Sequence, residues 1–229
     1  RHSDHYYDHY KPLAGAVARP GNAIMLAKRV GCSTTVVKEY SFSSSKAYHT
    51  CLKEARILHR LRHPNIVEIV SIFKLDRLQN SMGPVFCIEM PYYSFGRLDH
   101  FLENEKPNSF AVKRIFLNIL HAIHHLHAHG IVHRDIKPGN ILIDSGGNPR
   151  IADYDISVET AQRTTMQYTQ GSRLRYSSQE QPNQNMLRQC SQGTKDYMAP
   201  ELMNGPATFS SDMYSLGVTM QEVTDSYYN

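Results

Sequence analysis

Apolar and β-branched residues gather in short runs in the N-terminal part of the chain, with polar turns between them. Such runs predict strands over residues 23–30, 34–42, 65–73 and 84–90. A turn at Gly31, Cys32 and Ser33 joins the first two runs, so a hairpin is expected there. A polar loop over residues 74–84 separates the other two runs, and Pro91 breaks the pattern after the last one.

Elsewhere the apolar residues recur at intervals of three and four, which predicts helices. The first helix is expected over residues 46–62, the second from the cap candidates Asn108 and Ser109 to Gly130, and the third over residues 212–223. The apolar stripes are Cys51, Leu52, Ala55, Leu58 and Leu61 in the first helix, and Phe110, Val112, Ile115, Phe116, Ile119, Ile123 and Leu126 in the second. The chain therefore runs from a small β-rich part to a mostly helical part.

Two mostly polar segments are expected to be mobile. Residues 1–12, rich in His and Tyr, are interpreted as a flexible lead-in, and residues 155–192, rich in Gln, Ser, Thr, Arg and Asn, as a long loop. Because the chain begins with Arg1 instead of Met and ends at Asn229 soon after a helical pattern, we expect a piece of a longer protein.

Composition narrows the classes of protein. Of the 229 residues, 41% are hydrophobic and 20% charged, which is typical of a globular chain with a core. Its 25 Lys and Arg against 21 Asp and Glu give a net charge of +4, too mild an excess to indicate dedicated nucleic-acid binding. No apolar run approaches the roughly 18 residues of a membrane helix, and no signal peptide is recognisable. The four cysteines are scattered along the chain and are expected to be reduced. Together with the missing membrane and signal patterns, they predict an intracellular protein without membrane partners, in the cytoplasm or the nucleus.

One glutamate lies where the helical period predicts burial. Glu54 is three residues from Cys51 and four from Leu58, so its carboxylate shares a helix flank with apolar neighbours and needs a cation. Lys38, at the end of the apolar run TTVV, is the expected partner. The alternative is a solvated glutamate with a lysine that extends along the surface.

A dense cluster of polar residues follows the second helix, in the segment HRDIKPGN at 133–140 and in RIAD at 150–153. Asn140 and Asp153 offer the oxygen ligands that Mg²⁺ prefers, Asp135 can orient a hydroxyl, and Lys137 can neutralise a phosphate. These residue types together indicate phosphoryl transfer.

In this order and spacing the motifs resemble those of a eukaryotic-type protein kinase domain of the serine/threonine class, from about Gly15 to Val223. The matching pieces are Lys38 in VVK, Glu54, HRDIKPGN, Asp153-Tyr154-Asp155 in place of DFG, and Ala199-Pro200-Glu201 as APE. The resemblance implies an α+β, bilobal fold. Residues 13–91 would form a small lobe with an antiparallel β-sheet and one helix, and residues 92–229 a mainly helical lobe. That second lobe would be incomplete, with an activation segment at 153–201.

The resemblance also implies roles in an ATP- and Mg²⁺-dependent reaction. Lys38 would grip the phosphates and Glu54 would hold Lys38, while Asp153 and Asn140 would bind the metals. Asp135 would accept the proton of the substrate hydroxyl. Lys137, two residues after this aspartate, and the Gly193-Thr194 pair are similar to serine/threonine kinases, which implies a protein substrate with Ser or Thr acceptors.

The nucleotide would lie against a further set of residues implied by the same resemblance. Met90 matches the gatekeeper, Pro91 to Tyr93 match the hinge, and Val36 and Leu142 would sandwich the base; ordinary core packing is the alternative for these apolar side chains. The whole predicted ATP-binding set is Gly15, Ala16, Ala18, Gly21, Ala23, Val36, Lys38, Met90, Pro91, Tyr93 and Leu142.

Regulation is expected through phosphate binding by Arg134, which precedes the catalytic aspartate, and through Thr194. The phosphate would come from an activating kinase or from autophosphorylation in the polar loop; most of its Ser and Thr residues can equally be solubilising. Asp212 resembles the aspartate that braces the catalytic loop.

Two departures from the family pattern keep a second hypothesis open. Ala16 and Ala18 replace the first two glycines of the phosphate loop, and Asp155 replaces the DFG glycine. These changes favour a pseudokinase, a nucleotide-binding or scaffolding module without useful turnover. The intact charged residues favour the enzyme. A small-molecule phosphotransferase is disfavoured by GTKDYMAPE and the long segment, which suit a peptide.

Overall fold

The computed structural model describes residues 9–12, 22–28, 33–41, 45–75, 84–160 and 193–228. The chain divides into two compact units, and each is described by itself. The first consists of Arg1–Ala122 with Gly139–Asp155, and the second of Ile123–Pro138 with Ile156–Asn229. The lobe boundary expected between residues 91 and 92 stays a prediction.

The first unit contains a five-stranded antiparallel sheet with strand order β1-β2-β3-β5-β4. Its strands are β1 (His9–Pro12), β2 (Asn22–Lys28), β3 (Thr34–Ser41), β4 (Ser71–Leu75) and β5 (Val85–Pro91). The predicted hairpin is confirmed, since β2 and β3 pair antiparallel. β3 is the central strand, so Lys38 is held between Ile24 of β2 and Ile88 of β5.

Two segments differ from the predicted strand pattern. His9–Pro12, the end of the predicted flexible lead-in, forms the edge strand β1, where Pro12 is tolerated because an edge position needs no donor on its outer side. The run predicted as a strand from residue 65 is strand only from Ser71. Its first residues instead reach the strand that contains Ile151, whose N–H donates to the Asn65 carbonyl at 2.9 Å.

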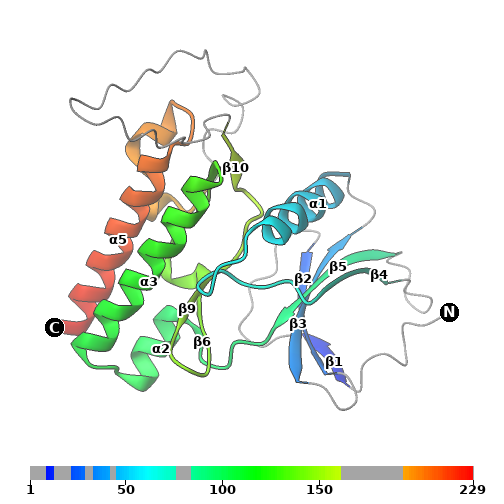
Figure 1. Cartoon of the computed structure of the whole chain (residues 1–229), viewed down its shortest axis with the longest axis horizontal. Coiled ribbons are helices and arrows are strands. Elements are labelled where there is room, and N and C mark those ends of the chain that lie inside the picture. Colours follow the sequence, from blue (N-terminus) through cyan, green and yellow to red (C-terminus); the bar gives the residue numbers. More distant parts are fainter. Residues whose placement is uncertain are drawn as a thin grey trace, which may run out of the picture. The chain divides into compact units, whose positions relative to one another are not determined.

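Helix α1 (Ser45–Arg60) packs on this sheet, as Figure 1 shows. Ala47, Cys51 and Ala55 of α1 form a core cluster with Tyr40 of β3 and Ile88 of β5. The predicted helix is confirmed, although Leu52 of its predicted stripe is 45% exposed.

The first unit also contains a small sheet with its neighbouring helix, and the larger part of α3 (Ser109–Ala128), up to Ala122. The strands β6 (Gly96–Arg97), β8 (Ile141–Ile143) and β9 (Pro149–Ile151) pair in the order β6-β8-β9, and α2 (Leu98–Glu105) contacts β6 and β8. The sequence pattern did not predict α2. The short 3-10 helix η1 (Pro138–Asn140) leads into β8.

Helix α3 (Ser109–Ala128) begins where the cap candidates predict, because the Asn108 side chain accepts the Ala111 N–H at 2.9 Å. Its predicted stripe is buried from Ile115 onward. Phe110 was wrongly placed in that stripe: it lies in the first turn and is 74% exposed.

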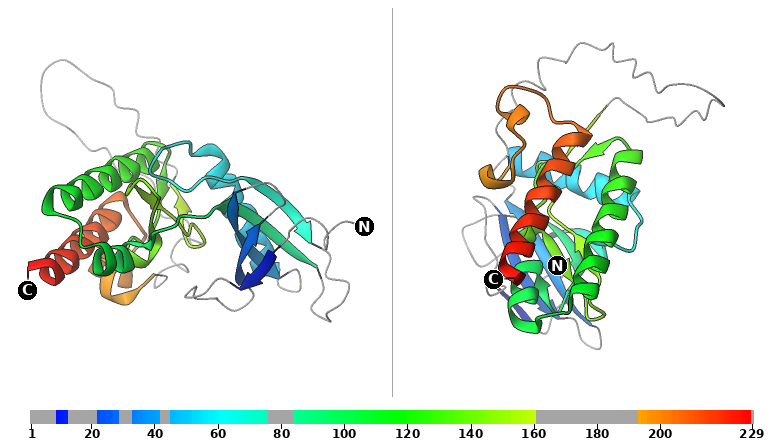
Figure 2. Two further views of the ribbon diagram at one scale, coloured as in Figure 1. Left: turned by 90° about the horizontal axis from the view of Figure 1, so that it is seen from below. Right: turned by 90° about the vertical axis from the view of Figure 1, so that its left-hand side faces the viewer.

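The second unit contains short strands and a long helix. Strands β7 (Ile131–Val132) and β10 (Val158–Glu159) pair antiparallel, so part of the predicted mobile loop is ordered; its residues 161–192 lie outside the described residues. Two 3-10 helices, η2 (Lys195–Tyr197) and η3 (Pro200–Met203), precede α5 (Phe209–Tyr228), and η2 contacts α5 (Figure 2). The predicted last helix is confirmed and is longer at both ends, and the α+β class is confirmed.

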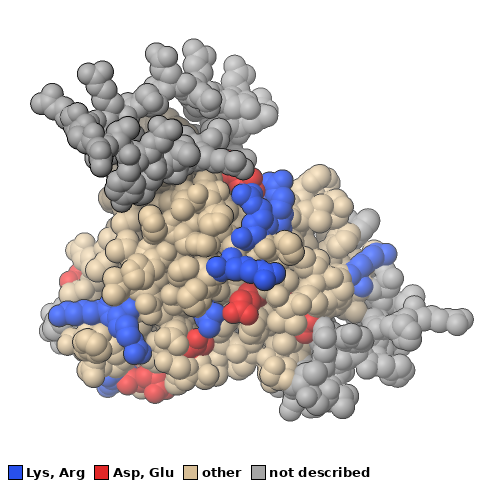
Figure 3. Space-filling view, in the orientation of Figure 1, with Lys and Arg blue, Asp and Glu red and all other residues tan. Residues whose placement is uncertain are grey.

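On the face drawn in Figure 3, Lys and Arg side chains form small separate groups beside Asp and Glu. Among the helices that the structure describes, none combines the length and apolar character that a bilayer crossing requires.

The packing of α1 on the sheet generates the first prediction. Ile88 is fully buried and Ile72, its partner across the β4–β5 pair, is 47% exposed. Replacing Ile88 with Ala should lower the free energy of unfolding by about 2–5 kcal/mol, because a cavity opens against α1. Ile72→Ala is the matched control and should cost less than about 0.5 kcal/mol. Urea unfolding measures both, and equal losses would contradict the assigned core.

Candidate active site

A buried ion pair joins β3 to α1. The Lys38 ammonium lies 2.9 Å from Glu54 Oε2 and 3.2 Å from Oε1. Glu54 is only 1% exposed and Lys38 7%. The structure therefore brings together the two residues that the helical period and the strand pattern single out, inside the first unit.

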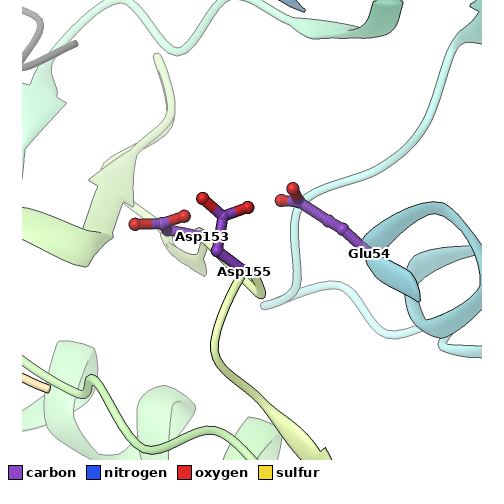
Figure 4. A group of neighbouring side chains, drawn as sticks. All are labelled: Glu54, Asp153 and Asp155. Carbon is purple, nitrogen blue, oxygen red and sulfur yellow. The ribbon is translucent and has the colours of Figure 1, made fainter. Parts of the chain in front are cut away.

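Two further carboxylates reach the same ammonium from the segment after β9. Asp153 Oδ1 lies 2.9 Å and Asp155 Oδ1 2.8 Å from Lys38 Nζ. Figure 4 shows the Asp155 and Glu54 side chains extending toward one another from the segment and from α1. Asp153 adopts a φ of 67°, a left-handed conformation that is uncommon for a residue with a side chain and that often marks functional positions.

Tyr40 completes this cluster, which we call the Lys38 cluster: Lys38, Tyr40, Glu54, Asp153 and Asp155. The Tyr40 hydroxyl bonds to Glu54 Oε2 and lies 2.9 Å from Asp155 Oδ1. Sequence reasoning missed Tyr40, although it follows Lys38 by two residues on a strand and therefore faces the same side of the sheet.

The electrostatics of the Lys38 cluster follow from burial and from its excess of carboxylates. Burial alone lowers the pKa of Lys38, but Glu54 and the neighbouring acids outweigh it and hold that pKa well above the usual value. Burial raises the pKa of Glu54 to about 7 despite the adjacent ammonium. Burial also acts to raise the pKa of Asp155, yet Lys38 and the hydrogen bonds hold it well below its usual value. Lys38 and Asp155 are thus ionised at neutral pH, and Glu54 is more easily protonated than an ordinary glutamate.

Oxygen atoms suited to a hard divalent cation collect in the same place. Glu54, Asp153 and Asp155 each offer a carboxylate oxygen, and these atoms lie within 4.8 Å of one another. Asn140, predicted as a metal ligand with Asp153, is buried in η1, and it is its backbone carbonyl that accepts the Ala152 N–H at 2.9 Å. An all-oxygen set of this kind fits Mg²⁺.

The predicted nucleotide-binding residues that the structure describes lie on strands of the first unit or just after them. Ala23 is on β2 and Val36 on β3, where Val36 faces Met90 of β5 across the pair. Pro91 ends β5 and Leu142 is the middle residue of β8. Gly15, Ala16, Ala18 and Gly21 lie outside the described residues.

Tyr93 of the predicted hinge is buried and anchored through its ring. The Arg150 guanidinium lies over the ring at 5.7 Å, and the hydroxyl accepts the Glu68 N–H at 3.4 Å. Its carbonyl accepts the Gly96 N–H at 3.0 Å, while its own N–H donates to no acceptor within the described residues.

The second unit holds a separate triangle of polar side chains: Asp135, Lys137 and Thr194. Asp135 Oδ1 accepts the Thr194 N–H at 3.1 Å and the Thr194 hydroxyl at 2.9 Å, and Asp135 Oδ2 lies 3.0 Å from the Lys137 ammonium. Lys137 also donates to the Thr194 hydroxyl. Burial acts to raise the pKa of Asp135, but the bonds to Lys137 and Thr194 outweigh it and lower that pKa, so the carboxylate is ionised.

The loop that carries Asp135 is held by the buried carboxylate of Asp212 in α5. This carboxylate accepts the backbone N–H groups of His133 and Arg134, both at 2.8 Å, and lies 2.9 Å from His127 Nε2. The resemblance of Asp212 to a loop-bracing aspartate thus has a direct geometric counterpart.

Arg134, the predicted regulatory residue, is buried with a φ of 75°. Its guanidinium donates to the Ile156 carbonyl at 3.3 Å. The Ser and Thr residues expected to be phosphorylated, and so to bind Arg134, lie in residues 161–192, outside the described residues.

Comparison with known proteins agrees with this inventory of motifs. The model of the family described as "protein kinase domain" matches residues 20–227. The chain belongs to the protein kinase family. The family resemblance and the protein-kinase-like fold, an antiparallel sheet followed by helical segments, are thereby confirmed.

Several serine/threonine kinases are similar to this protein kinase domain. Serine/threonine/tyrosine-protein kinase HT1 of Arabidopsis thaliana is 31% identical over 176 residues, which cover 75% of this chain and 37% of the relative. Serine/threonine-protein kinase STK11 of Homo sapiens is 30% identical over 182 residues, covering 77% and 36%. The chain thus spans little more than a third of the length of these curated relatives.

The raised pKa of Glu54 predicts a pH-dependent stability. A carboxyl whose pKa rises from 4.5 to about 7 on folding contributes stability that is complete below pH 4.5 and is lost as the pH rises through 7. Wild type should therefore lose part of its unfolding free energy between pH 5.5 and about 8, and Glu54→Gln should lack this component. Urea unfolding at several pH values measures it, with exposed Glu105→Gln as the control. Equal pH profiles for wild type and Glu54→Gln would contradict the assignment.

The Asp212 brace predicts a large effect of a small change. Asp212→Asn replaces one acceptor oxygen with an NH₂ donor that faces N–H groups, so it should lower the free energy of unfolding by about 2 kcal/mol. The exposed Asp196 in η2 provides a charge-matched control, and Asp196→Asn should change stability by less than about 0.5 kcal/mol. Chemical denaturation compares the two, and a neutral Asp212→Asn would show that the contacts carry no stability.

Proposed function

We propose that the protein is an ATP- and Mg²⁺-dependent serine/threonine protein kinase. The observation that carries the proposal is the triangle of Asp135, Lys137 and Thr194, in which an ionised carboxylate already accepts a hydrogen bond from a threonine hydroxyl. A group that binds one hydroxyl in this way is suited to orient the hydroxyl of a protein substrate. The relatives whose names say serine/threonine kinase support the same acceptor class.

In this proposal Asp135 orients the acceptor hydroxyl and takes its proton as the new phosphorus–oxygen bond forms and the bond between the γ-phosphorus and the leaving ADP breaks. Its lowered pKa makes it a weak base, so positioning matters more than proton abstraction early in the step. Lys137, 3.0 Å from Asp135, would neutralise charge on the transferred phosphoryl group.

Lys38 is proposed to donate to the α- and β-phosphates, with Glu54 fixing the position of its ammonium. Asp153 and Asn140 would hold Mg²⁺, since both offer hard oxygen ligands within the first unit. Bound Mg²⁺-ATP would supply the phosphoryl group and offset the charge of its oxygens. Catalysis would thus consist of positioning and charge neutralisation.

The adenine is proposed to bind at the hinge. The Tyr93 N–H, which has no acceptor within the described residues, and the Pro91 carbonyl would provide its hydrogen bonds. Val36 and Leu142 would pack on its two faces, next to Met90 as gatekeeper.

Control of activity is proposed to act through the activation segment at 153–201. Phosphate placed there by an activating kinase or by autophosphorylation would bind Arg134, and Thr194 would couple the end of the segment to Asp135. The proposed lobes are residues 13–91 and 92–229.

A pseudokinase is the second candidate function, and one observation favours it. Three carboxylates surround the Lys38 ammonium, so the phosphates must compete for that cation. A nucleotide-binding module without useful turnover would tolerate this competition.

Phosphoryl transfer provides the test. The protein should transfer label from radiolabelled ATP to a generic basic protein or to itself, and Asp135→Asn should lower the rate by roughly 10² to 10⁴-fold, because the hydroxyl loses its acceptor. Exposed Asp196→Asn, with the same change of charge, should keep the wild-type rate.

Three outcomes distinguish the candidates. Incorporation of labelled phosphate that persists in Asp135→Asn would contradict the catalytic role of Asp135. Nucleotide binding without transfer by the wild-type protein would support the pseudokinase. Transfer to Ser and Thr that depends on both ATP and Mg²⁺ would support the proposed kinase.

A further inference from the structure

The Lys38 ammonium has all of its donors committed. A lysine carries three N–H donors. In the Lys38 cluster they meet Glu54 at 2.9 Å, Asp153 at 2.9 Å and Asp155 at 2.8 Å. With Lys38 only 7% exposed, water has little access to loosen these bonds. An additional acceptor, such as a phosphate oxygen, must therefore displace one carboxylate.

The three carboxylates are not equivalent in the proposed function. Glu54 positions the ammonium and Asp153 is a proposed metal ligand, whereas the reaction gives Asp155 no task. Asp155 is nevertheless firmly held, at 7% exposure. The Tyr40 hydroxyl lies 2.9 Å from its carboxylate, and the Lys53 ammonium of α1 donates to its backbone carbonyl at 2.5 Å.

The balance of charge in the Lys38 cluster also disfavours binding of a phosphate without a second cation. The Lys38 cluster contains one ammonium and three carboxyl groups, so a phosphate that arrives alone meets an excess of negative charge in a buried place. The Asp153 carboxylate can break its ion pair with Lys38 at a low cost in free energy only when it binds another cation. One N–H of Lys38 then becomes free, while Asp155 still holds the second and Glu54 the third.

We propose that Asp155 is a positioning residue that makes nucleotide binding conditional on a divalent cation. This inference rests on the proposed function and concerns the control of the same site. Asp155 occupies the donor of Lys38 that a metal-free nucleotide would use, so phosphate binds only after Asp153 has turned to the metal. A glycine at this position leaves that donor free.

ADP binding tests the inference without any turnover. The dissociation constant of ADP is measured by calorimetry in EDTA and in Mg²⁺, for wild type, Asp155→Asn and Asp155→Gly. Asp155→Asn keeps the size of the side chain and removes its charge, and should tighten binding in EDTA by roughly 10- to 100-fold, the value of a hydrogen bond to a charged group. Binding in Mg²⁺ should change much less, so the ratio of the two constants falls.

Controls separate this effect from a general change of charge or of folding. Exposed Glu105→Gln removes one negative charge from α2 and should keep the wild-type ratio. Melting without ligand should show Asp155→Asn to be less stable than wild type, because it weakens bonds to Lys38 and Tyr40. Tighter ADP binding by a less stable protein is an outcome that a merely structural role does not produce.

Other outcomes overturn the inference. Metal-free affinity that is unchanged or weaker in both Asp155 variants shows that Asp155 does not compete for Lys38; if wild type still binds ADP with Mg²⁺ and transfers phosphate, the proposed function stands. Failure of all proteins to bind ADP even with Mg²⁺ also overturns the inference, and in that case the proposed function fails with it.

Discussion

The first unit depends on keeping one ammonium ion away from water. Lys38 lies on the central strand of the sheet, and burial of an unpaired charge there would be prohibitively costly. Its carboxylate partners come from α1 and from the segment after β9, so the requirement to pair Lys38 fixes three parts of the chain at once. The packing of α1 against the sheet and the position of Asp153 therefore both follow from the need to pair the Lys38 ammonium.

In the second unit, a few polar side chains each make several hydrogen bonds and so hold the loop that carries Asp135. A single buried carboxylate, Asp212, binds the backbone of the loop before Asp135, and the Thr194 hydroxyl both donates to Asp135 and accepts from Lys137. Charged groups that are hydrogen-bonded in this way are pre-arranged for a reaction and need little reorganisation. Each unit thus holds its own hydrogen-bonded set of charged side chains.

Much of this could be predicted from sequence because the signals are local. The periods of the apolar residues predicted α1, α3, α5 and the β2–β3 hairpin, and the helical position of Glu54 among apolar neighbours predicted its burial. The exposure of Leu52 and Phe110 could not be predicted, because it depends on where the neighbouring elements end. The bridge between Ile66 and Ile151 of β9 is likewise non-local.

The site shows the same division between local and non-local information. The motifs named Lys38, Glu54, Asp135 and Asp153, but Asp155 was identified only as a replacement of the DFG glycine. Its bond to Lys38 needs the path of the chain after β9, which no local pattern supplies. Tyr40 was within reach, since a polar tip two residues from a buried lysine on a strand must find a partner on the same face.

Because Asp212 holds its loop through main-chain N–H groups, the grip does not depend on which side chains positions 133 and 134 carry. The guanidinium of Arg134 makes a separate contact, with the Ile156 carbonyl. A change of side chain at position 134 would therefore leave both main-chain bonds to Asp212 in place.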